Sequence, residues 1–345
     1  MFNTFLRLVF PSHPKNDKNC FLMKKLLPLS LLLCLVVTGA LKGQDEAIFN
    51  HYMQNPIILN PAAAGFMDEY NVFVNARSQW AGLDDAPQTI AFRANGPVGE
   101  SFGIGGGFFT ETAAQQRRTK GQVDVSFRFG LGKAEKDVQP FRAAFGFLTE
   151  FQRITLDPNV VNNPHFEPGD EELMAFLDGK NQFDAGIGIY GSYREQVFGG
   201  LTINNLVSNR LQDISGTRLS EGLNYTLMLG TRIYNKDTKV SYTPSIMVRD
   251  IQDAPFMMDF NLQIGFQNEQ FIVQPSYRYL GAVGILFGVQ PAYGGFKGFR
   301  LYYSYDLPFG GLQQYSTGGH EITAGYAISR KSIKEKQQRN ASRQR

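Results

Sequence analysis

The sequence has almost no cysteine. Its 345 residues include two, Cys20 and Cys34, both near the N-terminus, so disulfide scaffolds, thiol nucleophiles and cysteine–metal sites are excluded for the rest. Beyond the first 43 residues there are three histidines, His51, His165 and His320, and none has metal-ligand spacing to another histidine. We therefore expect no metal and no other cofactor, and we predict that the protein is not an enzyme.

Long apolar runs are also scarce. The run from Leu26 to Thr38 follows Met23-Lys24-Lys25 and precedes small residues, which is the pattern of a secretory signal peptide. We expect residues 1–43 to be an upstream extension plus this removed signal, with an N-terminal anchor as the alternative. No later stretch has eighteen consecutive apolar residues, which argues against membrane-spanning helices but not against a membrane β-barrel, whose strands are only half apolar.

Excess positive charge is confined to the two ends. Residues 1–43 carry +5 and residues 330–345 carry +6, so the formal charge of +3 leaves −8 on residues 44–329. An acidic body gives no reason to expect nucleic acid as a partner. The basic tail 330–345 has few apolar residues, and we expect it to be disordered.

What the sequence has in abundance is two-residue alternation between about residues 70 and 329. Residues 123–129 read Val-Asp-Val-Ser-Phe-Arg-Phe, apolar on one face and polar on the other, and similar runs recur about fourteen times. An all-β fold follows, and an apolar outside with a polar inside is typical of a transmembrane antiparallel β-barrel of about 14 strands. We place this barrel at residues 70–329.

The expected connections between these strands alternate in length. The first, third and later odd connections, among them 111–120, 154–182 and 204–221, are longer than most of the even ones. Outer-membrane barrels have long loops outside and short turns in the periplasm, so this asymmetry predicts periplasmic N- and C-termini. Glycines inside the strands, such as Gly103, Gly105, Gly186 and Gly188, are interpreted as bulges or bends, because no helix follows them as a phosphate-binding loop requires.

Inward-facing arginines are expected along the barrel. They can form an internal salt-bridge lattice with Asp124 and Asp306, or they can tune a channel. The arginines concerned are Arg77, Arg128, Arg232, Arg249, Arg278 and Arg300.

The segment 44–69 differs from the rest. Two Asn-Pro pairs, Asn55-Pro56 and Asn60-Pro61, punctuate it with turns, and Phe49, Tyr52 and Met53 form a short apolar face. Two interpretations stay open: a plug that packs into the periplasmic mouth of the barrel, and a dedicated binding motif.

This segment and the first strands resemble the PorP/SprF family of type IX secretion system membrane proteins. The resemblance rests on an acidic residue, Phe and Tyr before Asn-Pro, then Asn-Pro-Ala and Gly, and later Arg-x-Gln-Trp and Ala-Pro-x-Thr. The matching motif positions, expected to be structural, are Asn55, Pro56, Asn60, Pro61, Ala62, Gly65, Arg77, Gln79, Trp80 and Pro87.

The resemblance implies an outer-membrane protein of Bacteroidota-type bacteria. It implies an accessory of type IX secretion that helps to export or anchor a secreted surface protein, such as a gliding adhesin, by binding its C-terminal domain. The implied partners are type IX secretion components, that C-terminal domain and outer-membrane lipid. An outer-membrane channel for a small or apolar solute is the alternative function.

The connection 154–182 is the predicted contact with a partner. It is acidic and contains a short apolar run, and long connections of this kind are often functional. The candidate residues are Asp170, Glu171, Glu172, Met174, Phe176 and Leu177. The alternative is a solvated acidic loop.

Overall fold

The computed structural model describes residues 49–132, 140–162, 169, 171–207, 222–251, 256–279, 281–309 and 314–330, without the side chains of Glu171 and Glu172. The expected signal region, Asp170 and the basic tail after Arg330 lie outside these residues, so the expectations for them stay predictions.

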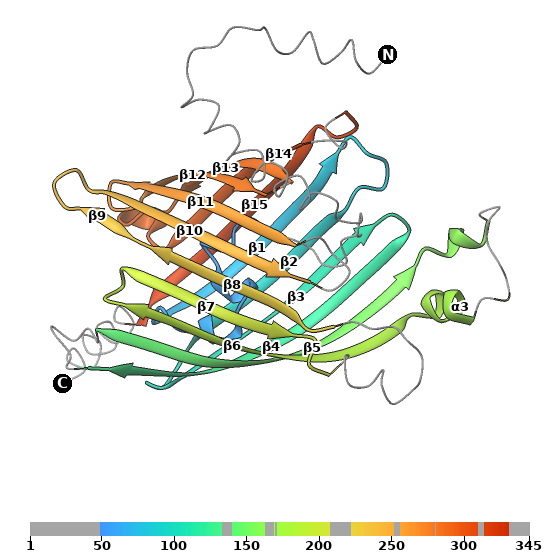
Figure 1. The fold of residues 1–345 in the computed structure, drawn as a ribbon, viewed down its shortest axis with the longest axis horizontal. Coiled ribbons are helices and arrows are strands. Elements are labelled where there is room, and N and C mark those ends of the chain that lie inside the picture. The colour runs from blue at the N-terminus through green and yellow to red at the C-terminus, as the bar shows by residue number, and fades with distance from the viewer. Residues whose placement is uncertain are drawn as a thin grey trace, which may run out of the picture. The chain divides into compact units, whose positions relative to one another are not determined.

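The described residues form a closed antiparallel barrel (Figure 1). Consecutive strands pair along the sequence, and β1 pairs with β15 from Glu69↔Ser329 to Ala81↔Gly318, which closes the sheet. β8 and β9 flank Arg232 and both pair with β10, so they are two pieces of one strand and the barrel has fourteen. The predicted fold is confirmed. The strands are β1 (Glu69–Ala81), β2 (Gln88–Val98), β3 (Phe102–Ala113), β4 (Gln116–Leu131), β5 (Phe141–Leu156), β6 (Lys180–Tyr193), β7 (Val197–Asn204), β8 (Asn224–Thr231), β9 (Ile233–Asn235), β10 (Val240–Asp250), β11 (Met257–Phe266), β12 (Phe271–Arg278), β13 (Ala282–Val289), β14 (Phe299–Pro308) and β15 (Gly318–Ser329).

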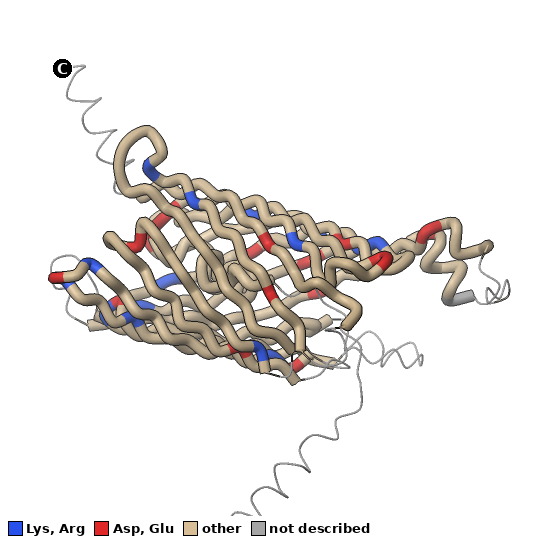
Figure 2. Tube along the Cα trace, turned by 90° about the horizontal axis from the view of Figure 1, so that it is seen from above, with Lys and Arg blue, Asp and Glu red and all other residues tan. Residues whose placement is uncertain are grey.

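The alternation in the sequence corresponds to the two faces of the wall. In β4, Val123 is 53% exposed whereas its neighbour Asp124 is fully buried, and Phe127 is exposed whereas Ser126 is buried. Most of the traced wall carries neither Lys or Arg nor Asp or Glu (Figure 2). The exposed apolar side chains thus face outward, as lipid requires, and the buried polar ones face the lumen.

Helices are short. They are η1 (Pro56–Ile58), η2 (Pro61–Ala63), η3 (Pro158–Asn162), α3 (Glu171–Asp178) and η4 (Gly294–Phe296). None of the helices in the described ranges is long and apolar enough to cross a membrane.

The strand ends correct the expected loops. Residues 111–120 are not a loop: β3 runs to Ala113 and β4 begins at Gln116 after a two-residue turn. At the opposite end, connections 132–140 and 290–298 are nine residues long. The two longest connections, 157–179 and 205–223, do lie at the same end, but loop length alone separates the ends less cleanly than expected.

Residues 111–120 were expected to form a loop because they are polar. They are polar because four strands continue beyond the apolar part of the wall. Phe108, Gly121, Phe151 and Phe183 are paired in one row across β3, β4, β5 and β6, and the three phenylalanines are about half exposed. Two residues further toward this end of the barrel, the next paired row on the same face consists of Thr110, Thr119, Arg153 and Asn181. β4 and β5 each have 16 residues, more than the roughly 9–11 that cross a bilayer. The polar residues at this end therefore belong to strands that extend beyond the apolar band, and not to a loop.

Candidate functional site

The lumen is occupied by the chain's own N-terminal residues 49–68, here called the plug. His51, Tyr52, Ala62 and Ala64 are between 0 and 1% exposed, although the plug contains only the 3-10 turns η1 and η2. Its turns satisfy some backbone groups internally, as where Asn55 N donates to the His51 carbonyl at 3.0 Å, and the buried groups that remain need partners on the wall. Its contacts therefore define the site.

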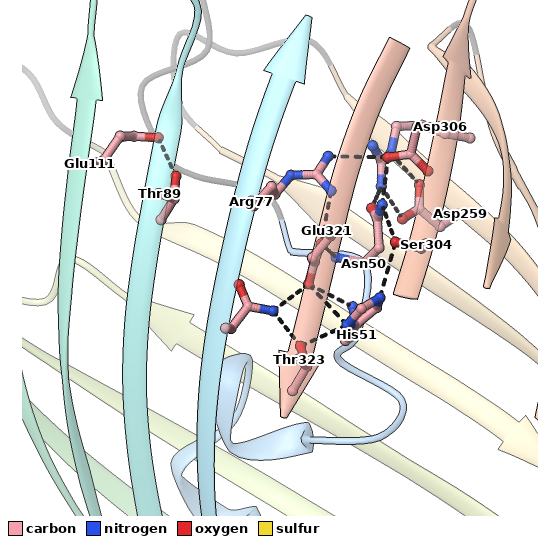
Figure 3. A network of polar contacts seen from close by, with 12 residues as sticks. Asn50, His51, Arg77, Thr89, Glu111, Asp259, Ser304, Asp306, Glu321 and Thr323 are labelled. Atoms are coloured by element: carbon pink, nitrogen blue, oxygen red, sulfur yellow. Dashed lines mark hydrogen bonds and ion pairs between the residues drawn. The ribbon is translucent and has the colours of Figure 1, made fainter. Parts of the chain in front are cut away.

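Glu321 of β15 is the centre of the contacts to the first half of the plug (Figure 3). One oxygen accepts hydrogen bonds from Arg77 Nη1 at 2.8 Å and from the backbone N–H of Asn50 at 2.7 Å. The other accepts from Asn75 Nδ2 at 2.7 Å and from the backbone N–H of His51 at 3.3 Å. The carboxylate is fully buried, so these donors replace the water that it lost.

Asn50 extends this network to a second pair of charges. Its Nδ2 donates to Asp306, which also accepts from Arg77 Nη2 at 3.2 Å. Its Oδ1 accepts from Arg278 Nη2 at 3.0 Å, while Arg278 makes a bidentate pair with Asp259 at 2.9 and 3.0 Å. One plug side chain thus links β11, β12 and β14.

The ring of His51 is held between two hydroxyls. Its Nδ1 lies 2.7 Å from Thr323 Oγ1 and its Nε2 lies 3.0 Å from Ser304 Oγ. Burial lowers the pKa of His51 below its ordinary value, although Glu321, 3.5 Å away, acts in the opposite direction. Burial thus favours the neutral imidazole when the plug is seated.

Further along the plug, amide and phenol groups continue the contacts. The phenolic oxygen of Tyr52 accepts from Asn261 Nδ2 at 2.7 Å. Gln54 Nε2 donates to Gln263 at 3.0 Å and to Gln274 at 2.9 Å. Neutral partners replace charged ones as the plug passes β11 and β12.

The second half of the plug lies against glycines of the wall. A Cβ placed on Gly103 would overlap the carbonyl oxygen of Ala64, and one on Gly146 would overlap the backbone nitrogen of Ala62. Gly188 makes room in the same way for the Asn60 side chain. The strand register continues through Gly103 and Gly188, so no bulge lies there. These positions instead let the plug approach closely, with its backbone at Gly103 and the Asn60 side chain at Gly188, which is the other reason for glycine in a strand.

Asn60 and two arginines fix this half. Asn60 Oδ1 accepts from Ala62 N at 2.9 Å, and its Nδ2 donates to the Ile189 carbonyl at 2.8 Å. Arg128 donates to the Gly65 carbonyl at 2.6 Å and to Asp68 at 2.8 Å, and Arg142 donates to Asp68 at 3.0 Å. The end of the plug is thus tied to β4 and β5.

Apolar contacts also hold the plug against the wall. Tyr52, Ala62 and Phe66 of the plug form one buried cluster with wall residues that include Tyr190 and Met228. The rings of Phe66 and Tyr190 meet edge to face with centroids 4.8 Å apart.

Lumenal arginines form ion pairs, as one interpretation expected, with Asp306 among the acids. The other expected acid, Asp124, accepts from Gln122 Nε2 at 2.6 Å. The further acids are Glu321, Asp259 and carboxylates near the barrel rim. Arg128 pairs with Asp68, Arg232 with Glu269 and Arg300 with Glu69.

The family-motif residues fall into two groups. Asn55, Pro56, Asn60, Pro61, Ala62 and Gly65 lie in the plug; Arg77, Gln79, Trp80 and Pro87 lie in β1 or just before β2. The backbone N–H of Gln79 donates to the Pro87 carbonyl at 2.9 Å. Trp80 has φ +50° where the β1–β15 register shifts. Arg77 bonds to Glu321 and Asp306, the two acids that also hold Asn50 of the plug.

The predicted partner-binding residues are apart from the plug. Met174, Phe176 and Leu177 lie on α3, between β5 and β6, with Met174 43% exposed and Lys180 Nζ 5.0 Å from the centre of the Phe176 ring. Glu171 and Glu172 are in the same helix. The structure brings these residues together on one short element.

Sequence reasoning missed Asn50, His51, Asn75, Glu321 and Thr323 as members of one site. The available signal was polar residues at inward positions of β1 and β15, but nothing in it indicates which of them a plug residue 270 positions away contacts.

Two small cavities lie between the plug and the wall among the described residues. A cavity of about 40 Å³ is lined by residues such as Phe49, Arg93 and Asn224, and one of about 10 Å³ lies beside Asn50 and Asp259. These volumes suit a few water molecules. Among the described residues, no group of three His, Cys, Asp or Glu could hold a metal ion.

The family model for type IX secretion system membrane protein PorP/SprF matches residues 41–326. The chain belongs to the PorP/SprF family. The predicted family is confirmed, and with it a membrane protein of type IX secretion whose barrel lies in the outer membrane. A comparison with curated proteins gives no match.

Among solved structures, the chain is similar to outer-membrane barrels at low identity. The CymD monoaromatic hydrocarbon channel is 9% identical, with 83% of this chain and 94% of that chain covered and a TM-score of 0.49. The Pseudomonas putida toluene transporter TodX is 11% identical, with 84% and 95% covered and a TM-score of 0.44. Likenesses this distant carry no further conclusion.

Proposed function

We propose that this PorP/SprF protein is a non-enzymatic outer-membrane accessory that binds the C-terminal domain of a secreted surface protein and helps to export or anchor it. A gliding adhesin is one such protein. The observation that carries the proposal beyond the family is the plug in the lumen. It contacts β2–β6, β11, β12, β14 and β15, so the barrel is a ring with a fixed centre, suited to holding a partner at its rim.

The proposal includes an orientation. With residues 1–43 removed as a signal region and fourteen strands, both ends of the sheet lie at the same end, which we assign to the periplasm. The opposite end then faces outside and carries the protruding parts of β3–β6 together with α3. The polar row beyond Phe108, Phe151 and Phe183 supports this, because it places several residues of each strand past the apolar band.

The partner contact is proposed at α3. Met174 is exposed at this end, and an exposed apolar side chain on a protruding element is a common anchor for a partner. The acidic residues that precede it in the sequence, Asp170, Glu171 and Glu172, favour a partner surface with positive charge.

The test is recovery of a secreted polypeptide with the protein from solubilised outer membranes. Met174→Asp is expected to reduce that recovery by about ten-fold, which corresponds to about 1.4 kcal/mol. Phe296→Asp is the matched control, because Phe296 is 74% exposed in η4 at the opposite end. Recovery of no secreted partner, together with solute-dependent conductance in planar bilayers, would instead establish a channel.

A further inference from the structure

The plug crosses the lumen from one end of the barrel to the other. Its last residue, Asp68, pairs with Arg128 and Arg142 near the end where the sheet begins and finishes. Near its start, Asn50 bonds to Asp306 and Arg278, which lie close to the other ends of β14 and β12. The plug therefore starts at the end proposed to face outside, here called the outer end, and finishes at the periplasmic end.

Phe49, the first residue of the plug, lies at this outer end. Its ring meets that of Phe109 with centroids 6.3 Å apart, and it lines the larger of the two cavities. The wall of this cavity includes Asn204, Asn224 and Arg249, from the outer ends of β7, β8 and β10. The chain that precedes Phe49 is therefore joined to the plug at the outer end of the lumen.

The larger cavity, here called the basic cavity, is lined by positively charged side chains. Among its described lining residues Arg93, Lys120 and Arg249 are bases, and none is an acid. Arg93 also donates to Gln122 at 3.0 Å, and Lys120 lies 3.1 Å from Glu150. Guanidinium groups favour carboxylates as partners, because the hydrogen bonds are charge-assisted and can be bidentate. The basic cavity is therefore suited to an acidic ligand.

The residues that lead into the plug supply such a ligand. Residues 44–48 read Gln-Asp-Glu-Ala-Ile, so Asp45 and Glu46 stand four and three positions ahead of Phe49. Four residues span at most about 14 Å, which keeps both carboxylates within reach of a cavity that Phe49 itself lines. The cavity volume of about 40 Å³ suits a few water molecules, and it suits one carboxylate group equally. Length, position and charge thus indicate the same occupant.

We propose that the acidic segment 44–48 binds the basic cavity, with the carboxylates of Asp45 and Glu46 paired to its bases. After the expected removal of residues 1–43, the amino terminus of the mature chain then lies at the outer end of the barrel, while the C-terminus stays at the periplasmic end. Ion pairs hold the plug at both ends of the lumen, through Asp45 and Glu46 at one and through Asp68 at the other. The binding does not involve a partner protein, so its failure would leave the proposed function intact.

Pairs of cysteines test where the segment lies. Cys20 and Cys34 fall in the region expected to be removed, so Ala47→Cys with Thr226→Cys gives protein from outer membranes with two thiols and both acids intact. A short bifunctional thiol reagent should join positions 47 and 226, because Thr226 lines the basic cavity. The matched control is Ala47→Cys with Asn71→Cys, since Asn71 is buried near the periplasmic end of β1, and it should give no product. Mass spectrometry of the joined peptides, on heat-modifiable folded barrel, is the measurement.

Three results would overturn this location. Product with position 71 and none with position 226 would place the segment at the periplasmic end. Product of position 226 with Ile214→Cys or Gln252→Cys, and none with position 47, would assign the cavity to a neighbouring connection. Folded barrel that gives no product at all would show that the segment does not enter the cavity.

Neutral variants test whether charge holds the segment. Asp45→Asn together with Glu46→Gln keeps the side-chain shapes, and it should lower the yield of the 47–226 product at least about five-fold, since charge-assisted bonds to buried guanidinium groups are lost. Asp84→Asn with Asp85→Asn is the control, because these exposed acids lie between β1 and β2 at the same end. It should leave the yield within about two-fold, since exposed charges contribute little. An equal yield with and without the charges of Asp45 and Glu46 would show that connectivity alone places the segment, and would overturn binding by the basic cavity.

Discussion

The two halves of the plug are held in different ways. Residues 50–54 are bonded to side chains of β11, β12, β14 and β15, and Arg77 of β1 supports them through Glu321 and Asp306. Residues 60–65 lie against backbone exposed by glycines in β3, β5 and β6. We expect the contacts of residues 50–54 to depend on charge and pH, and those of residues 60–65 to depend on the side-chain volume at the glycine positions. Different substitutions should therefore release the two halves of the plug separately.

Single-cysteine reporters distinguish these halves. The chain has no cysteine after Cys34, so Met53→Cys and Ala63→Cys each provide one reporter in protein that lacks the first 43 residues. Met53 packs on the cluster around Tyr52, and Ala63 is 9% exposed in η2. The rate at which a thiol reagent labels each cysteine measures how often that half leaves its seat.

The largest effect is expected from Glu321→Ala. Removing this carboxylate leaves Arg77 without its shorter pairing and two plug N–H groups without an acceptor, while Asn75 keeps only its bond to Thr323. Breaking a buried ion pair costs about 3–5 kcal/mol. Labelling at position 53 should rise by two orders of magnitude or more, and by less at position 63.

Glu195→Ala is the control for that change, because Glu195 is exposed in the turn between β6 and β7. Equal increases at both reporter positions after Glu321→Ala would show that the plug moves as one unit and would remove the distinction between the halves.

Gly146→Leu is expected to have a smaller effect on labelling, and mainly in the second half of the plug. The added side chain overlaps the backbone of Ala62, and overpacking of this kind costs about 1–3 kcal/mol. Labelling at position 63 should rise more than at position 53. Gly121→Leu is the control, since a Cβ at Gly121 meets nothing within 4 Å; an unchanged rate at position 63 in Gly146→Leu would contradict the close-approach role.

The same comparison shows what could be predicted from the sequence. The alternation at residues 123–129 determined which side chains face lipid, because a strand in a closed barrel has only two faces. Asn55-Pro56 and Asn60-Pro61 indicated an irregular segment ahead of the wall. The charged partners of that segment could not be predicted, since Glu321 occupies an inward position of the alternation in β15 like any other inward polar residue there.

Glycine and polar runs were misread for a related reason. Gly103 and Gly188 look alike in sequence whether a strand bends or another backbone approaches, and only the path of the plug distinguishes the two. Residues 111–120 are rich in Thr, Arg and Gln and were expected to form a loop, yet their pairing from Glu111↔Arg118 to Ala113↔Gln116 continues the sheet. The polar composition of residues 111–120 reflects their exposure to solvent, and it does not distinguish a strand from a loop.

The smallest effect is a dependence on pH at the first half of the plug. The seated ring of His51 faces Glu321, Arg77 and Asp306, and burial lowers its pKa below the ordinary 6.5, to which the ring returns when the plug leaves. The released form therefore binds more protons as pH falls below 6.5, and seating is weakened by up to about 1.4 kcal/mol per pH unit until the lower pKa of the seated ring is reached. The labelling rate at position 53 is divided at each pH by the rate at an exposed cysteine, because only the thiolate reacts. This ratio should rise by up to about five-fold between pH 6.5 and 5.5, since the released ring is already half protonated at pH 6.5, and His51→Gln should abolish the rise. A fall in the ratio on acidification would show that the attraction of Glu321 for a protonated ring exceeds the effect of burial.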